Sequence, residues 1–580
     1  MMGSGNIVRN DELASIFFRI AFLEEIREEG FKARAYERAS RTIGNLEREV
    51  DKIYLEGGLD ALISLPTIGK AIALKIEEFI NTGRVRAYDK LREQIQVDVD
   101  ELSAVEGIGP KTVKELYYKL GIKTLEDLEE AIGKGSVRRI RGMVTKKESR
   151  ILRSIVYLKD GRGRFPLGSV LATLKVIQER LESQEGVTKV IVAGSARRMK
   201  ETIEDAELIV EAEERSATSI IDCFVGMPEV DEVYERGPSK SRLRLRIGLI
   251  ANLRIVSRDN FGSALLHFTG SADHNITMRK LALSRGKKLN EYGLFDKEGK
   301  KIGGEDEAKI YSGLGLEWIP PELRENQGEI NRAINGKLPN LIAYGSLMGD
   351  LQIQTNWTDG MHSILEMAEG AKSRELSYIA ITDHTQSLAM IGGLDEDRLR
   401  DQRSEIKEGN EVIKDFRILF GAEVNILKDG SLDIADYALR ELEVVGAAIH
   451  SHFSLTSLEQ TNRILKAIEN ENIDILFHPT GRLLKQRQAY DIDMDKIMQR
   501  ASDTGTVLEI NSFPNRLDLR DIDVRRALEY HVKLVIDSDA HAVNHFDNLP
   551  LGVGQARRGW ATQVDVINTL PVDRFLRELK

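Results

Sequence analysis

Short apolar runs that end in histidine or aspartate recur along the C-terminal half of the chain. Four of the ten histidines fall near the ends of such runs, in YIAITDH (378–384), VVGAAIH (444–450), IDILFH (473–478) and KLVIDSDAH (533–541). A run of about four to eight apolar residues ending in a polar side chain is typical of a buried parallel strand with that side chain at its C-terminal edge. Several such strands, alternating with helical stretches, predict a βα barrel with a metal site at its rim.

The length and composition predict a soluble protein of several domains. A chain of 580 residues is too long for one hydrophobic core, so we expect roughly three to five domains. The single cysteine, Cys223, cannot form an internal disulfide and fits a reducing compartment. The first residues lack the basic segment and apolar core of a signal peptide, and no apolar stretch approaches the ~20 residues of a membrane span. We therefore expect a monomeric, cytoplasmic protein with no membrane partner.

The net charge of −10 means that any nucleic-acid surface must be a local basic patch. Residues 138–153 and 236–246 are the two candidates, and a solvated charged face is the alternative for each.

The pattern of residues changes several times along the chain. Residues 11–160 have the long amphipathic stretches of helices, and residues 187–256 mix helices with strands in VTKVIVAG, AELIVEAE, SRLRLRI and IANLRIV. Residues 260–330 are mixed and rich in loops, residues 324–342 look like a connector, and strands alternate with helices from about residue 346. This order predicts a multidomain α/β protein.

Two segments in the helical region share a pattern that binds DNA. LPTIGKAIALKIEEF (65–79) and VEGIGPKTVKELYYKLG (105–121) each place a Gly-containing turn, at Gly69 and at Gly107 and Gly109, before an amphipathic helix. Backbone N–H groups at such a turn can hold a phosphate without reading bases. This helix-hairpin-helix pattern predicts DNA binding. The first copy has Thr67 where the pattern prefers glycine.

At this point the chain resembles the family X DNA polymerases of bacteria and archaea, in which two such hairpins clasp DNA beside a gap or nick. The resemblance aligns Lys75 with a lysine that some members use to form a Schiff base with an abasic sugar, and a surface lysine is the alternative. It is strengthened by AGSARRMKETIEDAELIV (193–210) and by HFTGSADHNITMR (267–279). It implies a palm and a thumb, with a deoxynucleoside triphosphate as a further ligand. The implied nucleotide-binding residues are Gly194, Ser195, Arg198, Gly270, Ser271, Asn275 and Arg279.

The predicted palm departs from the family pattern at two catalytic positions. Asp205 and Glu207 alternate along a strand, so they face the same side and could hold Mg²⁺ or Mn²⁺. The family pattern has Asp where this chain has Glu207, and it takes a third carboxylate from a later strand. Here that third position is Asn252, in ANLRIV (251–256). A neutral amide does not balance the charge of the ions, so nucleotide insertion is predicted to be slow or absent.

The last ~240 residues resemble the polymerase-and-histidinol-phosphatase (PHP) domain, a distorted βα barrel with up to three metals. Its first motif appears as DLQIQTNWTDG (350–360), which keeps Asp359 but has Gln352 and Gln354 where histidines are usual. Its later motifs are intact. The implied metal ligands are Asp359, His384, Glu423, His450, His478, Asp539 and His541.

The resemblance also implies how these ligands divide among the metals, which would be Mn²⁺ or else Zn²⁺ or Fe²⁺. Glu423 would bridge two ions, His450 and His478 would complete one site, and these three residues would be catalytic. Asp359, His384 and His541 would form another site. The third site would use Gln352, Gln354, Glu423 and Asp539, and amide oxygens make it weak. Arg482, after HPTG, is a candidate phosphate contact, with a surface role as the alternative.

These patterns predict a DNA repair protein of the family X type, which binds gapped or nicked DNA and trims 3′ ends in its PHP domain. The alternatives are a non-catalytic DNA-binding scaffold and a phosphatase of small phosphomonoesters. The predicted parts are a helical domain with the first hairpin (1–90), a fingers-like domain with the second (91–165), the palm (166–258), the thumb (259–325), a linker (326–342) and the PHP domain (343–580).

Overall fold

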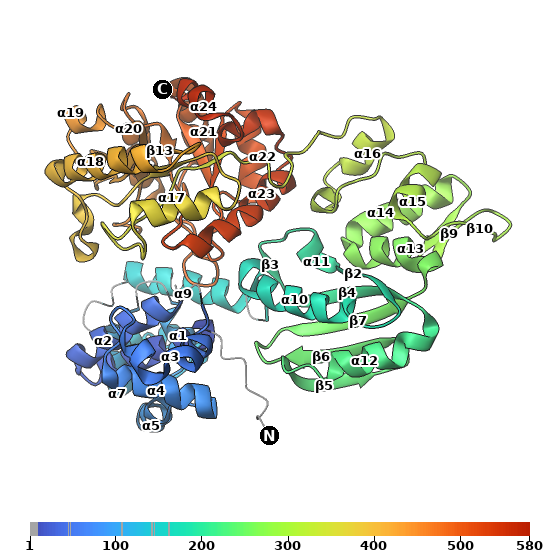
Figure 1. Cartoon of the computed structure of the whole chain (residues 1–580), viewed down its shortest axis with the longest axis horizontal. Coiled ribbons are helices and arrows are strands. Elements are labelled where there is room, and N and C mark those ends of the chain that lie inside the picture. The colour runs from blue at the N-terminus through green and yellow to red at the C-terminus, as the bar shows by residue number, and fades with distance from the viewer. Residues whose placement is uncertain are drawn as a thin grey trace.

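In the computed structural model, a helical N-terminal part, a five-stranded sheet, a smaller mixed part and a barrel of seven parallel strands follow one another along the chain (Figure 1). The structure describes residues 10–579 apart from residues 45, 47, 106, 107, 141, 142, 144, 161 and 162. This is the predicted multidomain α/β order. Among the described residues, no helix has both the length and the apolar character that crossing a membrane requires.

The helical part has a single hydrophobic core. Buried apolar side chains form one cluster from Leu13 to Ile155, and this cluster crosses the boundary predicted at residue 90. The helices are α1 (Asn10–Ile26), α2 (Gly30–Gly44), α3 (Val50–Ile63), α4 (Lys70–Thr82), α5 (Arg86–Gln94), α6 (Val99–Ser103), α7 (Pro110–Leu120), α8 (Leu125–Gly133) and α9 (Thr145–Asp160).

The five-stranded sheet has the order β2-β4-β7-β6-β5, in which β4 and β7 are parallel and the other neighbours are antiparallel. Residues of β4 alternate between its two faces, so Leu208 packs with α10 and α12 while Ile209 packs with α13. Asp205 and Glu207 share the face of Ile209. The elements are β2 (Val187–Val192), β4 (Asp205–Ala212), β5 (Val230–Arg236), β6 (Lys240–Leu245), β7 (Ile250–Val256), α10 (Leu167–Glu182), α11 (Gly194–Arg197) and α12 (Ala217–Val225).

The next part packs helices around a small antiparallel sheet of β8, β9 and β10. The segment predicted as a linker carries a helix, α16, whose Ile330 and Ala333 join the core of this part. Glu329 on the same helix is fully buried and accepts a hydrogen bond from His274 (2.7 Å). The elements are α13 (Arg258–Thr269), α14 (Ala272–Ser284), β8 (Lys288–Asn290), β9 (Gly293–Phe295), β10 (Lys301–Gly303), α15 (Glu307–Gly313) and α16 (Glu329–Ile334).

The C-terminal barrel holds its seven strands in sequence order, and a bridge between Ile353 and Ala540 joins the first strand region to the last. Along β12, Tyr378 faces the interior and Ile379 faces the outer helices. The strands are β11 (Gly349–Asp350), β12 (Tyr378–Ile381), β13 (Arg417–Asn425), β14 (Val444–Ala448), β15 (Ile475–Leu476), β16 (Val507–Asn511) and β17 (Leu534–Asp537). The main helices are α17 (Ile364–Lys372), α18 (Glu396–Val412), α20 (Ser457–Ile468), α21 (Met494–Thr504), α22 (Asp521–Glu529), α23 (Leu549–Arg558) and α24 (Val572–Glu578).

Candidate functional site

The rim of the barrel gathers the predicted metal ligands around one carboxylate. Glu423 lies in β13 and is fully buried, and His384, His450 and His478 follow the ends of β12, β14 and β15. The Nε2 atoms of His478 and His450 lie 2.9 and 3.1 Å from Glu423 Oε1, and His384 Nδ1 lies 3.2 Å from Oε2. Burial alone would raise the pKa of Glu423, but the nearby imidazoles hold it well below its usual value.

The structure brings all seven predicted ligands together at this rim, and each of them contacts at least one other. Asp359 Oδ1 lies 3.7 Å from Nε2 of both His384 and His541. The ligand atoms of Asp359, His384 and His541 lie within 4.8 Å of one another, as do those of His384, Glu423 and His450, so His384 belongs to both groups. Asp359 Oδ1 and His384 Nδ1 are buried and have no hydrogen-bond partner within the described parts of the chain. Buried oxygen and nitrogen atoms that converge in this way without hydrogen bonds are suited to ligate a divalent cation.

Two of the imidazoles are held in a fixed orientation by bonds behind the site. His450 Nδ1 donates to Asn425 Oδ1 (2.7 Å), and His541 Nδ1 donates to the Asp539 carbonyl (2.8 Å). Each bond fixes the tautomer and leaves Nε2 free for a ligand role. The sequence prediction did not include Asn425. Its position two residues after Glu423, on the same side of β13, was the available signal.

The third predicted metal group is arranged differently. Gln354 Nε2 donates to Glu423 Oε2 (2.9 Å), and Asn511 Nδ2 donates to Gln352 Oε1 (2.9 Å). Asp539 Oδ2 pairs with the guanidinium of Arg516 at 3.0 Å, and that charge helps hold the pKa of Asp539 below its usual value, against the effect of burial. Carboxamides and a guanidinium therefore occupy this part of the rim, and this set does not fit a cation.

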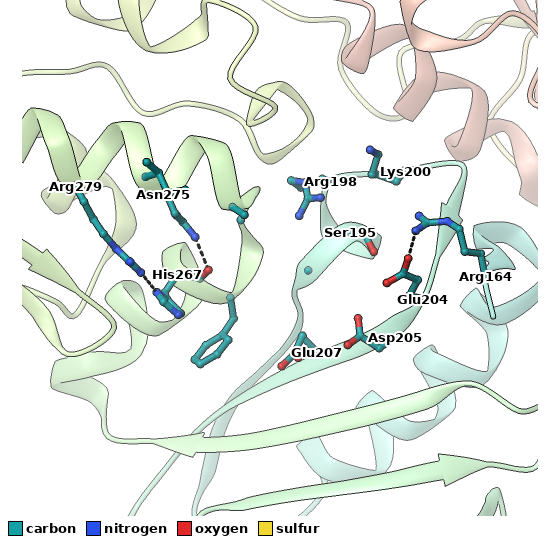
Figure 2. A pocket seen from close by; sticks show the side chains of 15 residues that line it. Arg164, Ser195, Arg198, Lys200, Glu204, Asp205, Glu207, His267, Asn275 and Arg279 are labelled. Carbon is teal, nitrogen blue, oxygen red and sulfur yellow. Dashed lines mark hydrogen bonds and ion pairs between the residues drawn. The ribbon is translucent and has the colours of Figure 1, made fainter. Parts of the chain in front are cut away.

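A pocket of about 610 Å³ lies between the five-stranded sheet part and helices α13 and α14, beside the starts of β4 and α11 (Figure 2). The predicted nucleotide-binding residues that line the pocket are Gly194, Ser195, Arg198, Gly270, Asn275 and Arg279. Ser271, the other residue predicted for this role, caps the start of α14, where its hydroxyl accepts a hydrogen bond from His274 N (3.3 Å).

Asn252 lies between the two carboxylates of this pocket. The register pairs Asn252 with Glu207, and its Nδ2 lies 2.9 Å from Glu207 Oε1 and 3.2 Å from Asp205 Oδ2. Burial raises the pKa of Glu207 to about 7, although Arg254 opposes the rise. An amide that donates hydrogen bonds therefore takes the position where the sequence comparison expects a third carboxylate.

Other pocket side chains are held by protein partners. Arg279 bonds His267 Nδ1 at 2.9 Å and Asn275 donates to the His267 carbonyl at 2.7 Å (Figure 2). Arg198 Nε pairs with Glu325 Oε1 at 3.0 Å.

The described parts of both hairpins leave their turns open. Gly69 and Gly109 immediately precede α4 and α7, and a Cβ at either would meet nothing within 4 Å. Gly107 lies outside the described residues. Thr67 has φ 63°, the backbone region that favours glycine. Lys75 is half-buried, and its ammonium donates to the Ala71 carbonyl (3.0 Å) and lies 5.7 Å from the centre of the Tyr36 ring.

The candidate basic segments differ in what the structure describes. In 236–246, Arg236 pairs with Asp222, Lys240 with Glu235, and Arg244 with Asp231, which favours a charge-balanced solvated face. Segment 138–153 includes residues 141, 142 and 144, which lie outside the described residues.

Comparisons with known proteins match nearly the whole chain. Residues 264–325 match the DNA polymerase beta thumb family, residues 8–85 the helix-hairpin-helix domain family, and residues 59–120 and 99–155 the SAM-like helix-hairpin-helix tandem family. The DNA polymerase/3′-5′ exonuclease PolX of Bacillus subtilis (strain 168) is 34% identical over 562 residues, which cover 96% of this chain and 97% of that protein. A probable phosphatase of Thermoanaerobacter sp. (strain X514) is 27% identical over 230 residues, which cover 38% of this chain and 89% of that protein.

Paired hairpins, a thumb and a seven-stranded barrel similar to a probable phosphatase define a DNA polymerase-type chain with an additional C-terminal barrel. The chain belongs to the family X DNA polymerases that carry a C-terminal PHP domain. The predicted family and fold class are confirmed. The roles predicted for individual residues stay predictions.

Proposed function

We propose that the chain is a DNA repair enzyme that binds gapped or nicked DNA and hydrolyses phosphodiesters at 3′ ends on the rim of its barrel. The observation that carries this proposal is the pair of overlapping ligand groups around His384, in which Asp359 Oδ1 and His384 Nδ1 are buried and have no hydrogen-bond partner among the described residues. The PolX relative is named as a polymerase and 3′-5′ exonuclease, which supports the same reaction.

The chain's own residues supply the geometry for this reaction. Asp359, His384 and His541 would hold one ion, and Glu423, His450 and His478 would hold a second. Mn²⁺, Zn²⁺ or Fe²⁺ in such a set lowers the pKa of water and neutralises phosphate oxygens. Asn425 and the Asp539 carbonyl keep the imidazoles oriented, and Arg516 adds positive charge beside the rim.

Degradation of labelled single-stranded and gapped DNA with Mn²⁺ tests the hydrolysis. The wild-type protein should shorten 3′ ends, and Glu423→Ala with His478→Ala should abolish this. Asp429→Asn is the control, because Asp429 is an acid of the same barrel that bonds Ser431 on the surface. An inactive wild-type protein, or activity that survives both substitutions, would contradict the proposal.

We further propose that nucleotide insertion by the palm is weak or absent, because Asn252 donates to both remaining carboxylates. Primer extension on gapped DNA, with Mg²⁺ and with Mn²⁺, tests this beside a Glu207→Asp/Asn252→Asp double variant. Restored carboxylates should increase extension. Robust extension by the unmodified protein would end the proposal.

A non-catalytic scaffold is a second candidate, favoured by the arrangement of Gln352, Gln354 and Arg516 around the third metal group. Elemental analysis of the purified protein separates the two candidates, since a scaffold need not retain metal. An enzyme of the proposed type should bind about two ions per chain, one for each ligand group.

A further inference from the structure

Two loops at the metal rim of the barrel pack into the palm. Leu484 and Leu517, one from each loop, are buried in the same apolar cluster as residues of α10 and β4. Gly168 on α10 permits the close approach, since a Cβ there would lie 2.6 Å from Pro514 Cβ. The palm therefore packs directly against the loops that follow β15 and β16.

The loop after β15 carries His478 at one end and is held at several points. Thr480 donates from N and from Oγ1 to the two oxygens of Asp518, both at 2.9 Å. Tyr490 OH donates to the Pro479 carbonyl (2.8 Å). Asp518 belongs to the loop after β16, so the two loops are joined two residues from a predicted metal ligand.

Arg482 links both loops to the palm. Its side chain is 6% exposed, and its Nη2 donates to Glu201 Oε2 of the palm (2.7 Å) and to the Leu517 carbonyl of the second loop. Its Nε atom is buried and finds no hydrogen-bond acceptor among the residues that the structure describes. A buried guanidinium needs a carboxylate, and Glu201 supplies it from the turn that follows Arg198.

Without Glu201, the guanidinium would be free to turn to Asp518, a buried acid that its charge already reaches. The positive charge of Arg482 already acts on Asp518, where it opposes the rise in pKa that burial causes. Asp518 uses both oxygens to hold Thr480. Competition for those oxygens would loosen the loop and change the position of the His478 ring relative to Glu423.

We propose that Arg482 is a positioning residue for the His478 side of the metal rim and that Glu201 of the palm holds Arg482 in place. The barrel rim is thus completed by a residue from another part of the chain. This inference rests on the proposed hydrolysis at the rim, and it gives the palm a role that does not depend on nucleotide insertion.

Glu201→Gln tests this in the full-length protein, because it removes the charge and keeps the shape. The control is Glu229→Gln, which removes a comparable palm ion pair, with Arg180 at 2.6 Å. Mn²⁺ binding, followed by electron paramagnetic resonance, should weaken about tenfold at one of the two sites in Glu201→Gln only, as loss of a supporting contact does. The kcat for 3′-end hydrolysis should fall while the KM for DNA stays unchanged.

A second variant keeps the test decisive if Glu201→Gln is unstable. Glu201→Asp retains a carboxylate and should recover most of the Mn²⁺ affinity and kcat. Wild-type Mn²⁺ binding in Glu201→Gln, or an equal loss in Glu229→Gln, would overturn the inference. If the wild-type protein neither binds Mn²⁺ nor degrades DNA, the proposed function fails instead, so the two failures are distinguishable.

Discussion

A buried carboxylate between two arginines joins the palm to the thumb. Glu307 is buried and bonds both Arg197, at 2.8 Å, and the fully buried Arg324, at 2.7 Å. Burial alone would raise the pKa of Glu307, but Arg324 and Arg197 lower it to about 2. The two guanidiniums therefore decide the charge state of this acid.

This shift in the pKa of Glu307 predicts acid-sensitive stability. The folded pKa lies below the ordinary value of 4.5, so the stabilisation is complete above that pH and is lost as pH falls from about 4.5 towards 2. The loss should reach about 3 kcal/mol, from about 1.4 kcal/mol per unit of pKa. Thermal unfolding between pH 5 and about 2.5 should show a smaller dependence of stability on pH in Glu307→Gln than in the wild-type protein. The variant should also be less stable at pH 7, because Arg197 and Arg324 lose their charged partner. An identical pH dependence in the variant would contradict the prediction.

Asn425 is predicted to set the metal affinity of His450. Asn425→Ala removes the acceptor for His450 Nδ1, so the ring can rotate and the Mn²⁺ affinity should fall about tenfold. Asn410→Ala is the matched control, because Asn410 lies in the same barrel and bonds the backbone of Ile418 rather than a metal-site side chain. A Mn²⁺ titration of both variants checks the effect, and equal affinity in the two would count against it.

At the scale of elements, the contact between α10 and the barrel depends on the missing side chain of Gly168. In Gly168→Ala the new Cβ would lie 2.6 Å from Pro514 Cβ and 2.9 Å from Leu551 Cδ1, so α10 must shift. The variant should lose about 1–3 kcal/mol of stability, as overpacked sites do. Gly133→Ala, on α8, is the control, since a Cβ there meets nothing within 4 Å. Thermal unfolding that ranks the two variants equally would refute this explanation.

Elements with a strong apolar pattern could be predicted from the sequence. Strands β4 and β7 and the barrel strands have buried apolar runs, and parallel strands bring their C-terminal ends to one edge, which is why the ligands of the rim meet. Strand β5 was not predicted, because most of its residues are exposed on an edge and lack a buried face. The sequence predicts a linker over residues 326–342, where the structure has helix α16, because the burial of this helix depends on a distant partner, His274.

Contacts that depend on side-chain orientation could not be predicted. The sequence marks Gln352, Gln354 and Asn252 as replacements for usual ligands, but it does not show that each amide turns toward a carboxylate or another amide. The sequence makes Arg482 a candidate phosphate contact. In the structure, Arg482 instead pairs with Glu201, which lies far away in the sequence. Such pairs are set by the packing of separate parts of the chain.

At the scale of the whole molecule, one chain of ion pairs crosses the palm, the thumb and the barrel. Glu325 Oε1 lies 3.0 Å from Arg198 Nε and 2.9 Å from Arg558 Nη1, and Arg558 Nε bonds Asp521 Oδ2 at 2.9 Å. Burial raises the pKa of Glu325, but Arg198 and Arg558 outweigh that effect and keep it low. The arginine that faces the palm pocket is therefore already paired with an anion.

Glu325 should thus compete with a nucleoside triphosphate for Arg198. Glu325→Gln removes the competing charge from beside the pocket, so deoxynucleoside triphosphate should bind about five- to tenfold more tightly, which corresponds to about 1 kcal/mol or slightly more. Arg558 keeps Asp521 as its partner in this variant, so the barrel contact remains.

Glu322→Gln is the matched control, because Glu322 also links the thumb to the barrel, through Arg557 at 2.8 Å, and does not line the pocket. Calorimetric titration with a triphosphate in Mg²⁺ should show tighter binding in Glu325→Gln alone. Unchanged or weaker binding there would mean that Arg198 does not leave Glu325 to meet the phosphates.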